Sequence, residues 1–340
     1  MVFSTKSRSS VSYSVTRRRA AAVRRPDDVK GTASPDDTSE MWSTMTNTEL
    51  KVTQGTIPYK GYETWYERVG ESEPGKAPLL TLHGGPGALH NYLKSLDGIA
   101  EMGREVIYYD QLGCGNSPTP YLPDLWSPEL WMDEIDALRD ALGLDEIHLL
   151  GQSWGGMLAM QYAIEHQPKG VKSMVVASSP ASLDLWASEA MRLLEYLPEE
   201  HKQAILKGLA DEVYDSPEYL AASDVYYARH VCNLSPYPDY VDYSFSRMGD
   251  VYHTMQGYNE FMVIGKLTGW DITDGLGTIT IPTLLTSGTD DEATPLIMKT
   301  IFDRIPDCKW ELFYGTHLCH VEQAPLYNKT VEAFFAAHDG

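Results

Sequence analysis

The chain has 340 residues, of which 43% are hydrophobic and 22% charged, and its formal net charge is −21. A chain of this length can bury a core large enough for one α/β domain with an insertion, or for two domains. The acidic charge argues against nucleic acid and anionic membrane surfaces as partners, and no uncharged apolar stretch is long enough to span a membrane.

Residues 1–46 are predicted to form a disordered tail, because they are rich in Ser, Thr and Arg and poor in aliphatic residues. Residues 1–25 contain seven Lys or Arg and no Asp or Glu, a composition that also resembles an organelle transit peptide. We favour the disordered tail and a cytoplasmic location. A mitochondrial location is the alternative if residues 1–25 act as a transit peptide.

The folded part of the chain is expected to begin with a β-hairpin formed by residues 51–60 and 62–69, which are rich in Thr, Tyr, Trp and Val. A buried strand at 77–82 then leads into the turn His83-Gly84-Gly85-Pro86-Gly87. The next strand, at 106–109, leads into the turn Asp110-Gln111-Leu112-Gly113-Cys114-Gly115-Asn116-Ser117.

The most informative segment is Gly151-Gln152-Ser153-Trp154-Gly155-Gly156, which follows an apolar strand at 147–150 and precedes a predicted helix at 157–164. A strand, a sharp turn and a helix form a nucleophile elbow, which lifts the central serine above the sheet. The helix that begins behind Ser153 favours negative charge near the serine hydroxyl. Ser153 is therefore the predicted nucleophile.

Strands that alternate with helices predict a doubly wound, mostly parallel sheet whose site lies beyond the carboxyl ends of its strands. After Pro180 the sequence becomes helical up to about Gly269, which is too long for a loop and predicts a helical cap over the site. The expected elements are a helix from Ser127 to Gly143, strands at 174–177, 282–288 and 309–314, cap helices at 185–197, 199–214 and 217–231, and a closing helix at 324–338. The predicted domains are a core at 47–180 and 276–340 and a cap at 181–275.

A serine nucleophile needs a histidine base and a carboxylate that orients the base, and in this fold the chain order is Ser, Asp or Glu, His. After the strand that ends at Gly288, Asp291 occupies the usual position of the acid and is preferred to Asp290. After the last strand, His317 follows a Gly-Thr turn and is preferred to His320 as the base. Activity should then fall as His317 is protonated, near the unperturbed pKa of about 6.5.

Acyl transfer also needs donors for the negative oxygen of the tetrahedral intermediate. The backbone N–H of Trp154, directly after the nucleophile, is the first expected donor. The N–H of Gly85 is the second, because a glycine there lets the backbone approach the substrate closely.

The turns at 83–87, 110–117 and 151–156 together closely resemble those of the proline iminopeptidases (prolyl aminopeptidases) of the α/β-hydrolase superfamily. The resemblance runs from about residue 50 to the C-terminus and includes the segment from Gly288 to Pro295. It implies an α/β-hydrolase fold, with a mostly parallel sheet flanked by helices and a helical cap inserted after the sixth strand. It also implies a serine peptidase that removes an N-terminal residue, often proline, from short peptides.

The same resemblance implies that acidic side chains hold the free α-amino group of the substrate. Glu292 follows the predicted acid, and Glu260 lies in an Asn-Glu-Phe segment that resembles a cap motif of the family. Carboxylates beside a protonated amine provide both affinity and register. Trp154, Tyr258 and Phe261 are a hypothetical slot for a proline ring. Leu112 departs from the arginine of many relatives, which is expected to change a salt bridge under the site.

The predicted function is a serine exopeptidase that acts on a short peptide or amino-acid amide with a free N-terminal amine. An amidase or esterase acting on an amino-acid derivative or secondary metabolite is the alternative, and a binding protein without turnover is a rival of another class. No metal or organic cofactor is implied, and the oligomeric state does not follow from the sequence. The cysteines have neither paired nor metal-type spacing and are interpreted as reduced thiols; they are Cys114, Cys232, Cys308 and Cys319.

Overall fold

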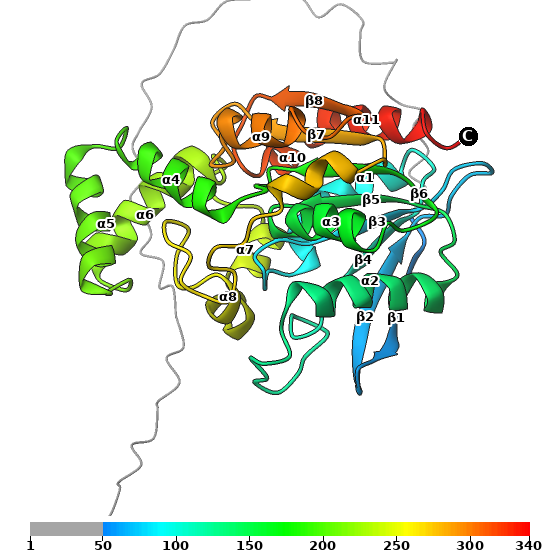
Figure 1. Cartoon of the computed structure of the whole chain (residues 1–340), viewed down its shortest axis with the longest axis horizontal. Coiled ribbons are helices and arrows are strands. Elements are labelled where there is room, and N and C mark those ends of the chain that lie inside the picture. The colour runs from blue at the N-terminus through cyan, green and yellow to red at the C-terminus, as the bar shows by residue number, and fades with distance from the viewer. Residues whose placement is uncertain (1–49) are drawn as a thin grey trace, which may run out of the picture. The chain divides into compact units, whose positions relative to one another are not determined.

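A single sheet runs through the part of the chain that the computed structural model describes, residues 50–340 (Figure 1). The predicted tail at 1–46 and its transit-peptide-like segment lie outside these residues. Eight strands of the described residues are hydrogen-bonded in the order β1-β2-β4-β3-β5-β6-β7-β8. The strands are β1 (Val52–Tyr59), β2 (Tyr62–Val69), β3 (Leu79–Leu82), β4 (Val106–Tyr109), β5 (Ile147–Gln152), β6 (Val171–Ala177), β7 (Thr283–Gly288) and β8 (Cys308–Phe313).

The predicted parallel sheet is confirmed. The hairpin of β1 and β2 is antiparallel and joins the sheet antiparallel to β4, whereas every pair from β4 to β8 is parallel. The short strands β3 and β4 are buried at every residue, as expected where helices cover both faces of a sheet. The carboxyl ends of β3 to β8 therefore meet at one edge of the sheet.

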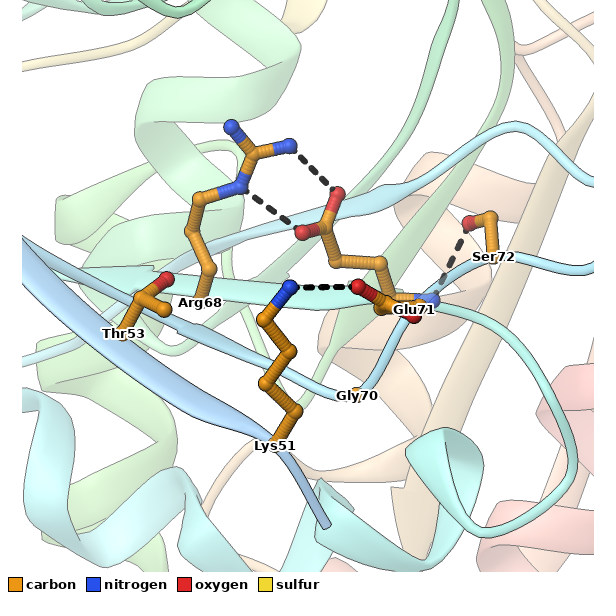
Figure 2. Close-up of a pocket in the computed structure, with 7 residues that line it drawn as sticks. Lys51, Thr53, Arg68, Gly70, Glu71 and Ser72 are labelled. Carbon is orange, nitrogen blue, oxygen red and sulfur yellow. Dashed lines mark hydrogen bonds and ion pairs between the residues drawn. The ribbon is translucent and has the colours of Figure 1, made fainter.

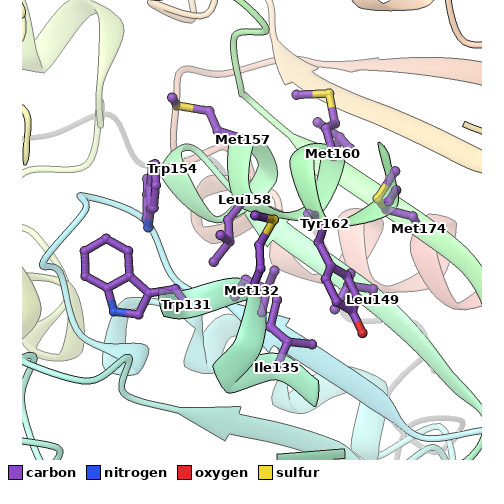
Figure 3. Close-up of a cluster of buried hydrophobic side chains, with 14 of the residues drawn as sticks. Trp131, Met132, Ile135, Leu149, Trp154, Met157, Leu158, Met160, Tyr162 and Met174 are labelled. Carbon is purple, nitrogen blue, oxygen red and sulfur yellow. The ribbon is translucent and has the colours of Figure 1, made fainter. Parts of the chain in front are cut away.

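The helices that flank the sheet begin and end where residue types favour it. Helix α2 begins after Ser127, whose hydroxyl accepts a hydrogen bond from the N–H of Leu130, and it ends at Gly143, which has a φ of 65°. Figure 3 shows α2 packed on α3 through Trp131 and Trp154. The flanking helices are η1 (His90–Leu96), α1 (Asp97–Ala100), α2 (Pro128–Leu142), α3 (Trp154–Glu165), α9 (Pro295–Phe302), α10 (Cys319–Glu322) and α11 (Ala324–Ala336).

The segment between β6 and β7 is helical, and most of its helices gather at one side of the sheet, whereas the last one, η2, lies against α3 (Figure 1). They are α4 (Leu183–Leu194), α5 (Glu199–Asp211), α6 (Pro217–His230), α7 (Asp239–Phe245), α8 (Asp250–Met255) and η2 (Thr273–Thr278). The first three overlap the predicted cap helices. The sequence does not predict α7 and α8, because six or seven residues are too few to show a helical period.

The inserted helices have a hydrophobic cluster of their own, which includes Leu194, Ile205 and Phe261. The described residues nevertheless belong to one compact unit. No helix among residues 50–340 is both long enough and apolar enough to cross a bilayer.

Candidate active site

Ser153 lies between the end of β5 and the start of α3, with φ and ψ of 55° and −122°. A positive φ is rare for a residue with a side chain and costs on the order of 1–3 kcal/mol. The neighbouring glycines make the turn possible. A Cβ on Gly151 would lie 2.1 Å from the carbonyl oxygen of Gly155, and one on Gly155 would lie 2.0 Å from that of Leu82. The turn at Ser153 thus has the backbone of a nucleophile elbow.

We expect Gly155→Ala to lower the free energy of unfolding by about 3 kcal/mol, because the new methyl group cannot fit beside Leu82 without a backbone shift. Urea unfolding measures this change. Gly143→Ala is the matched control, since it also adds a methyl group, there at a positive φ, but meets nothing within 4 Å. An equal loss of stability in the two variants would contradict the steric explanation.

The predicted acid and base are hydrogen-bonded to each other. The Nδ1 of His317 lies 2.9 Å from Oδ1 of Asp291, and both side chains are buried. The other oxygen, Oδ2, accepts hydrogen bonds from the hydroxyl of Ser178 at 2.6 Å and the N–H of Gly288 at 3.1 Å. The N–H of Ala293 donates to Oδ1 at 2.7 Å. The carboxylate is therefore fixed, and it orients the imidazole so that Nε2 is free to take a proton.

The two alternative residues lie elsewhere. The side chain of Asp290 is exposed and accepts a hydrogen bond from the hydroxyl of Thr289. His320 is buried, with its Nδ1 2.8 Å from Oγ of Ser95, and burial lowers its pKa to about 3. His320 therefore stays neutral and belongs to the interior.

The turn after β3 lies directly against the nucleophile. A Cβ on Gly84 would be 3.0 Å from Cβ of Ser153. Gly85 has a φ of 113°, a conformation that favours glycine. Within residues 50–340, neither the N–H of Gly85 nor that of Trp154, the first residue of α3, has an acceptor. Both donors are thus available to a negative oxygen.

A buried network that the sequence did not predict links three active-site turns. The N–H of Gln111 donates to Nε2 of His83 at 2.9 Å, and the side chain of Gln111 contacts both the carbonyl of His83 and Nε1 of Trp154. Burial lowers the pKa of His83 to about 4, so the ring is neutral. Because Nε2 accepts, Nδ1 carries the proton and donates to the carbonyl of Gly84, 3.0 Å away.

Tyr92 forms a second link. Its hydroxyl accepts from the N–H of Gly84 at 2.7 Å and donates to Oε1 of Gln152 at 2.6 Å. The amide of Gln152 in turn donates to the carbonyl of His317 at 3.3 Å. The only sequence signal for these links is the presence of polar residues in or near the glycine-rich turns.

The C-terminus of α6 holds the acid and base loops together. The carbonyl oxygen of His230 accepts hydrogen bonds from the N–H of Glu292 at 3.2 Å and the N–H of His317 at 3.0 Å. The Nδ1 of His230 also donates to the carbonyl of Asp290 at 2.9 Å. A backbone carbonyl has no side-chain signature, so sequence reasoning could not find this contact.

Both predicted amine-binding glutamates lie at the acid–base pair. Glu292 is buried, and its Oε1 is 3.9 Å from Nε2 of His317. Glu260 is partly buried and accepts a hydrogen bond from the hydroxyl of Tyr252. Burial raises the pKa of both carboxyls, whereas a positive charge on His317 acts in the opposite direction and favours their ionised forms.

The pKa of His317 is not at its ordinary value, so the expected midpoint near 6.5 is corrected. Burial alone lowers the pKa, but the charge and hydrogen bond of Asp291 and the charges of Glu292 and Glu260 outweigh it and raise the pKa to about 9. The carboxylates stabilise the imidazolium.

We therefore expect the acidic limb of kcat/KM to lie well above pH 6.5 and towards pH 9, because His317 accepts the serine proton only when neutral. Activity rises with pH through this limb. Initial rates below KM across the pH range measure it. A limb at or below pH 6.5 would show that the carboxylates do not stabilise the imidazolium.

The three aromatic residues of the hypothetical proline slot are not brought together. Trp154 is buried and packs edge-on against Trp131. Phe261 is buried among the inserted helices, whereas Tyr258 is 54% exposed and stacks on Tyr214. A shared slot is not formed.

Leu112 lies beside the buried carboxyl of Glu134, and the expected change of a salt bridge under the site stays a prediction. Its N–H is 3.1 Å from both carboxylate oxygens of Glu134, to which the hydroxyl of Thr64 also donates. Burial raises the pKa of Glu134 to about 8. The side chain of Leu112 carries no positive charge that would lower this pKa.

A cavity of about 480 Å³ at the start of β1 and the end of β2 lies apart from these residues (Figure 2). Its charged side chains pair with one another. Lys51 contacts Glu71 at 2.5 Å, and Arg68 makes two hydrogen bonds to Glu105 at 2.7 and 2.8 Å. The cavity has no unpaired charge that would single it out as a site.

The sequence matches the alpha/beta hydrolase fold family over residues 77–322. A proline iminopeptidase of Clostridioides difficile (strain 630) is 45% identical over 295 residues, covering 85% of this chain and 100% of the relative. One of Lactobacillus delbrueckii subsp. lactis is 42% identical with the same coverage. The crystal structure of a proline iminopeptidase of Mycobacterium smegmatis is 40% identical, covers 84% of this chain and 99% of that chain, and superposes with a TM-score of 0.79.

Proposed function

The chain belongs to the proline iminopeptidases of the α/β-hydrolase fold, and from this premise we propose that Ser153, Asp291 and His317 are its catalytic triad. The enzyme is a serine aminopeptidase that releases an N-terminal residue, preferably proline, from short peptides. The observation that carries the triad is the buried hydrogen bond from His317 to Asp291, with the backbone of His317 hydrogen-bonded to Gln152, the residue before Ser153.

In the proposed reaction Ser153 attacks the carbonyl carbon of the N-terminal residue while His317 takes the serine proton. The N–H groups of Gly85 and Trp154 stabilise the oxyanion. His317 then donates its proton to the leaving amine, and an acyl-enzyme remains. Water, activated by His317, hydrolyses the acyl-enzyme and frees Ser153.

Glu260 and Glu292 bind the free amine of the substrate. Two carboxylates in a water-poor site attract an ammonium strongly, and they restrict cleavage to the first peptide bond because only that residue carries the amine. A short peptide or amino-acid amide with a free N-terminus is the substrate class that this charge pattern fits. An acetylated N-terminus would bury the carboxylates without a partner.

The test uses 4-nitroanilides of proline, alanine and leucine, each with a free or an acetylated amine. We expect cleavage of free-amine substrates only, with proline first, and a fall of about 10- to 100-fold in kcat/KM for Glu260→Gln. Acetylated substrates, on which wild type and Glu260→Gln should not differ, are the control. Efficient cleavage of acetylated substrates or simple esters would favour an amidase or esterase instead.

The division into a core at 47–180 and 276–340 and a cap at 181–275 remains a proposal, supported by the separate hydrophobic cluster of the inserted helices. A cytoplasmic location is also proposed. It is supported by the four cysteines, all of which are free thiols in the structure.

A further inference from the structure

Glu292 faces the nitrogen of His317 that must accept the serine proton. The Nδ1 side of the ring is occupied by Asp291, and Oε1 of Glu292 lies 3.9 Å from Nε2. The other oxygen, Oε2 of Glu292, is buried without a hydrogen-bond partner among residues 50–340. A buried carboxylate oxygen without a partner is unfavourable, and a cationic group that reached this oxygen would stabilise the carboxylate.

The charges around His317 are unbalanced in the free enzyme. Carboxylates face the imidazole from two elements: Asp291 and Glu292 from the loop after β7, and Glu260 from the loop after α8. No Lys or Arg of the described residues lies within salt-bridge distance of these three carboxylates. Further titratable neighbours of these groups are Tyr226 and Tyr227 of α6, Tyr237, Tyr252 of α8 and His320 of α10.

We propose that Glu292 holds the proton on Nε2 of His317 in the free enzyme, and that the cationic amine of the substrate releases this proton when it binds Glu292. This inference rests on the proposed function. The substrate amine then has two roles: it binds the substrate to Glu292, and it converts His317 from an imidazolium into a neutral base. Peptides without a free amine fail in the chemical step as well as in binding.

The proton balance is simple. In the free enzyme, Glu292 as a carboxylate neighbours His317 as an imidazolium. A substrate ammonium replaces the imidazolium as the counter-ion of Glu292, and the proton on Nε2 passes to solvent. Neutral His317 then accepts the proton of Ser153. If the substrate arrives as a neutral amine, it takes the proton from Nε2 directly, and nothing is released.

The first experiment measures how fast a small fluorophosphonate, which has no amine, labels Ser153 between about pH 5 and pH 10. We expect a wild-type midpoint well above pH 6.5. In Glu292→Gln the midpoint should fall by about one pH unit or more, with labelling at pH 7 faster by about tenfold. Asp290→Asn is the matched control, because it removes an exposed charge from the same loop and should leave the midpoint unchanged.

The second experiment measures proton release by calorimetry of prolinamide binding to Ser153→Ala in buffers of different ionisation enthalpy. We expect about one proton released near neutral pH, and clearly less when Glu292→Gln is added. Equal labelling midpoints in wild type and Glu292→Gln, or no proton release on binding, would overturn the proposal. Failure of the proposed function is a separate result, because labelling of Ser153 is measured without any peptide substrate.

Discussion

Replacing Ser153 with alanine should lower kcat for a prolyl nitroanilide by about four to six orders of magnitude, because no acyl-enzyme can form. The residual rate comes from the oxyanion donors and from binding, both of which remain. The thermal stability of the variant should stay close to that of the wild type. The serine side chain makes no capping hydrogen bond to α3, and alanine loses only an oxygen atom at a partly exposed position.

Steady-state kinetics and thermal unfolding of the purified variant check both expectations. KM should change little, since Glu260 and Glu292 still bind the amine. Ser179→Ala is the control variant. The hydroxyl of Ser179 donates to the carbonyl of Ser153 at 2.8 Å but takes no part in the reaction, so its loss should lower kcat far less than the loss of the Ser153 hydroxyl. If Ser153→Ala kept more than about one hundredth of the wild-type kcat, the assignment of the nucleophile would be wrong.

The order of the strands, the longer helices and the elbow could be predicted from the sequence because each depends on neighbouring residues. The two glycines that the turn requires, Gly151 and Gly155, lie two residues before and two residues after Ser153, so the sequence around the serine is enough to identify the turn. The same holds for the alternation of strands and helices, which predicts a parallel sheet before any contact is known. Loops at the carboxyl ends of parallel strands then meet at one edge.

The supports of the site could not be predicted, because they join residues far apart in the chain. Tyr92 reaches Gln152, and the carbonyl of His230 reaches His317, through contacts that only the folded chain creates. The pKa of His317 was missed for the same reason. The unperturbed pKa applies to a histidine in water. In the folded chain, burial lowers the pKa of His317, whereas the neighbouring carboxylates raise it by a larger amount.

Asp291→Asn should lower kcat by about three to four orders of magnitude, whereas Asp290→Asn should change it less than about twofold. An asparagine side chain in place of Asp291 cannot satisfy all the donors that surround the native carboxylate. With its nitrogen in place of Oδ1, it would force the proton of His317 onto Nε2, and the base would be lost. With its nitrogen in place of Oδ2, it would leave the N–H of Gly288 without an acceptor.

Either placement also removes the charge that stabilises the imidazolium, so the acidic limb of the residual activity should move to lower pH than in the wild type. This direction separates Asp291 from a residue that only supports the loop, whose loss would lower kcat without moving the limb. The pH profiles of the two asparagine variants, measured side by side, therefore decide which aspartate orients His317. A large loss in Asp290→Asn with an active Asp291→Asn would reverse the assignment.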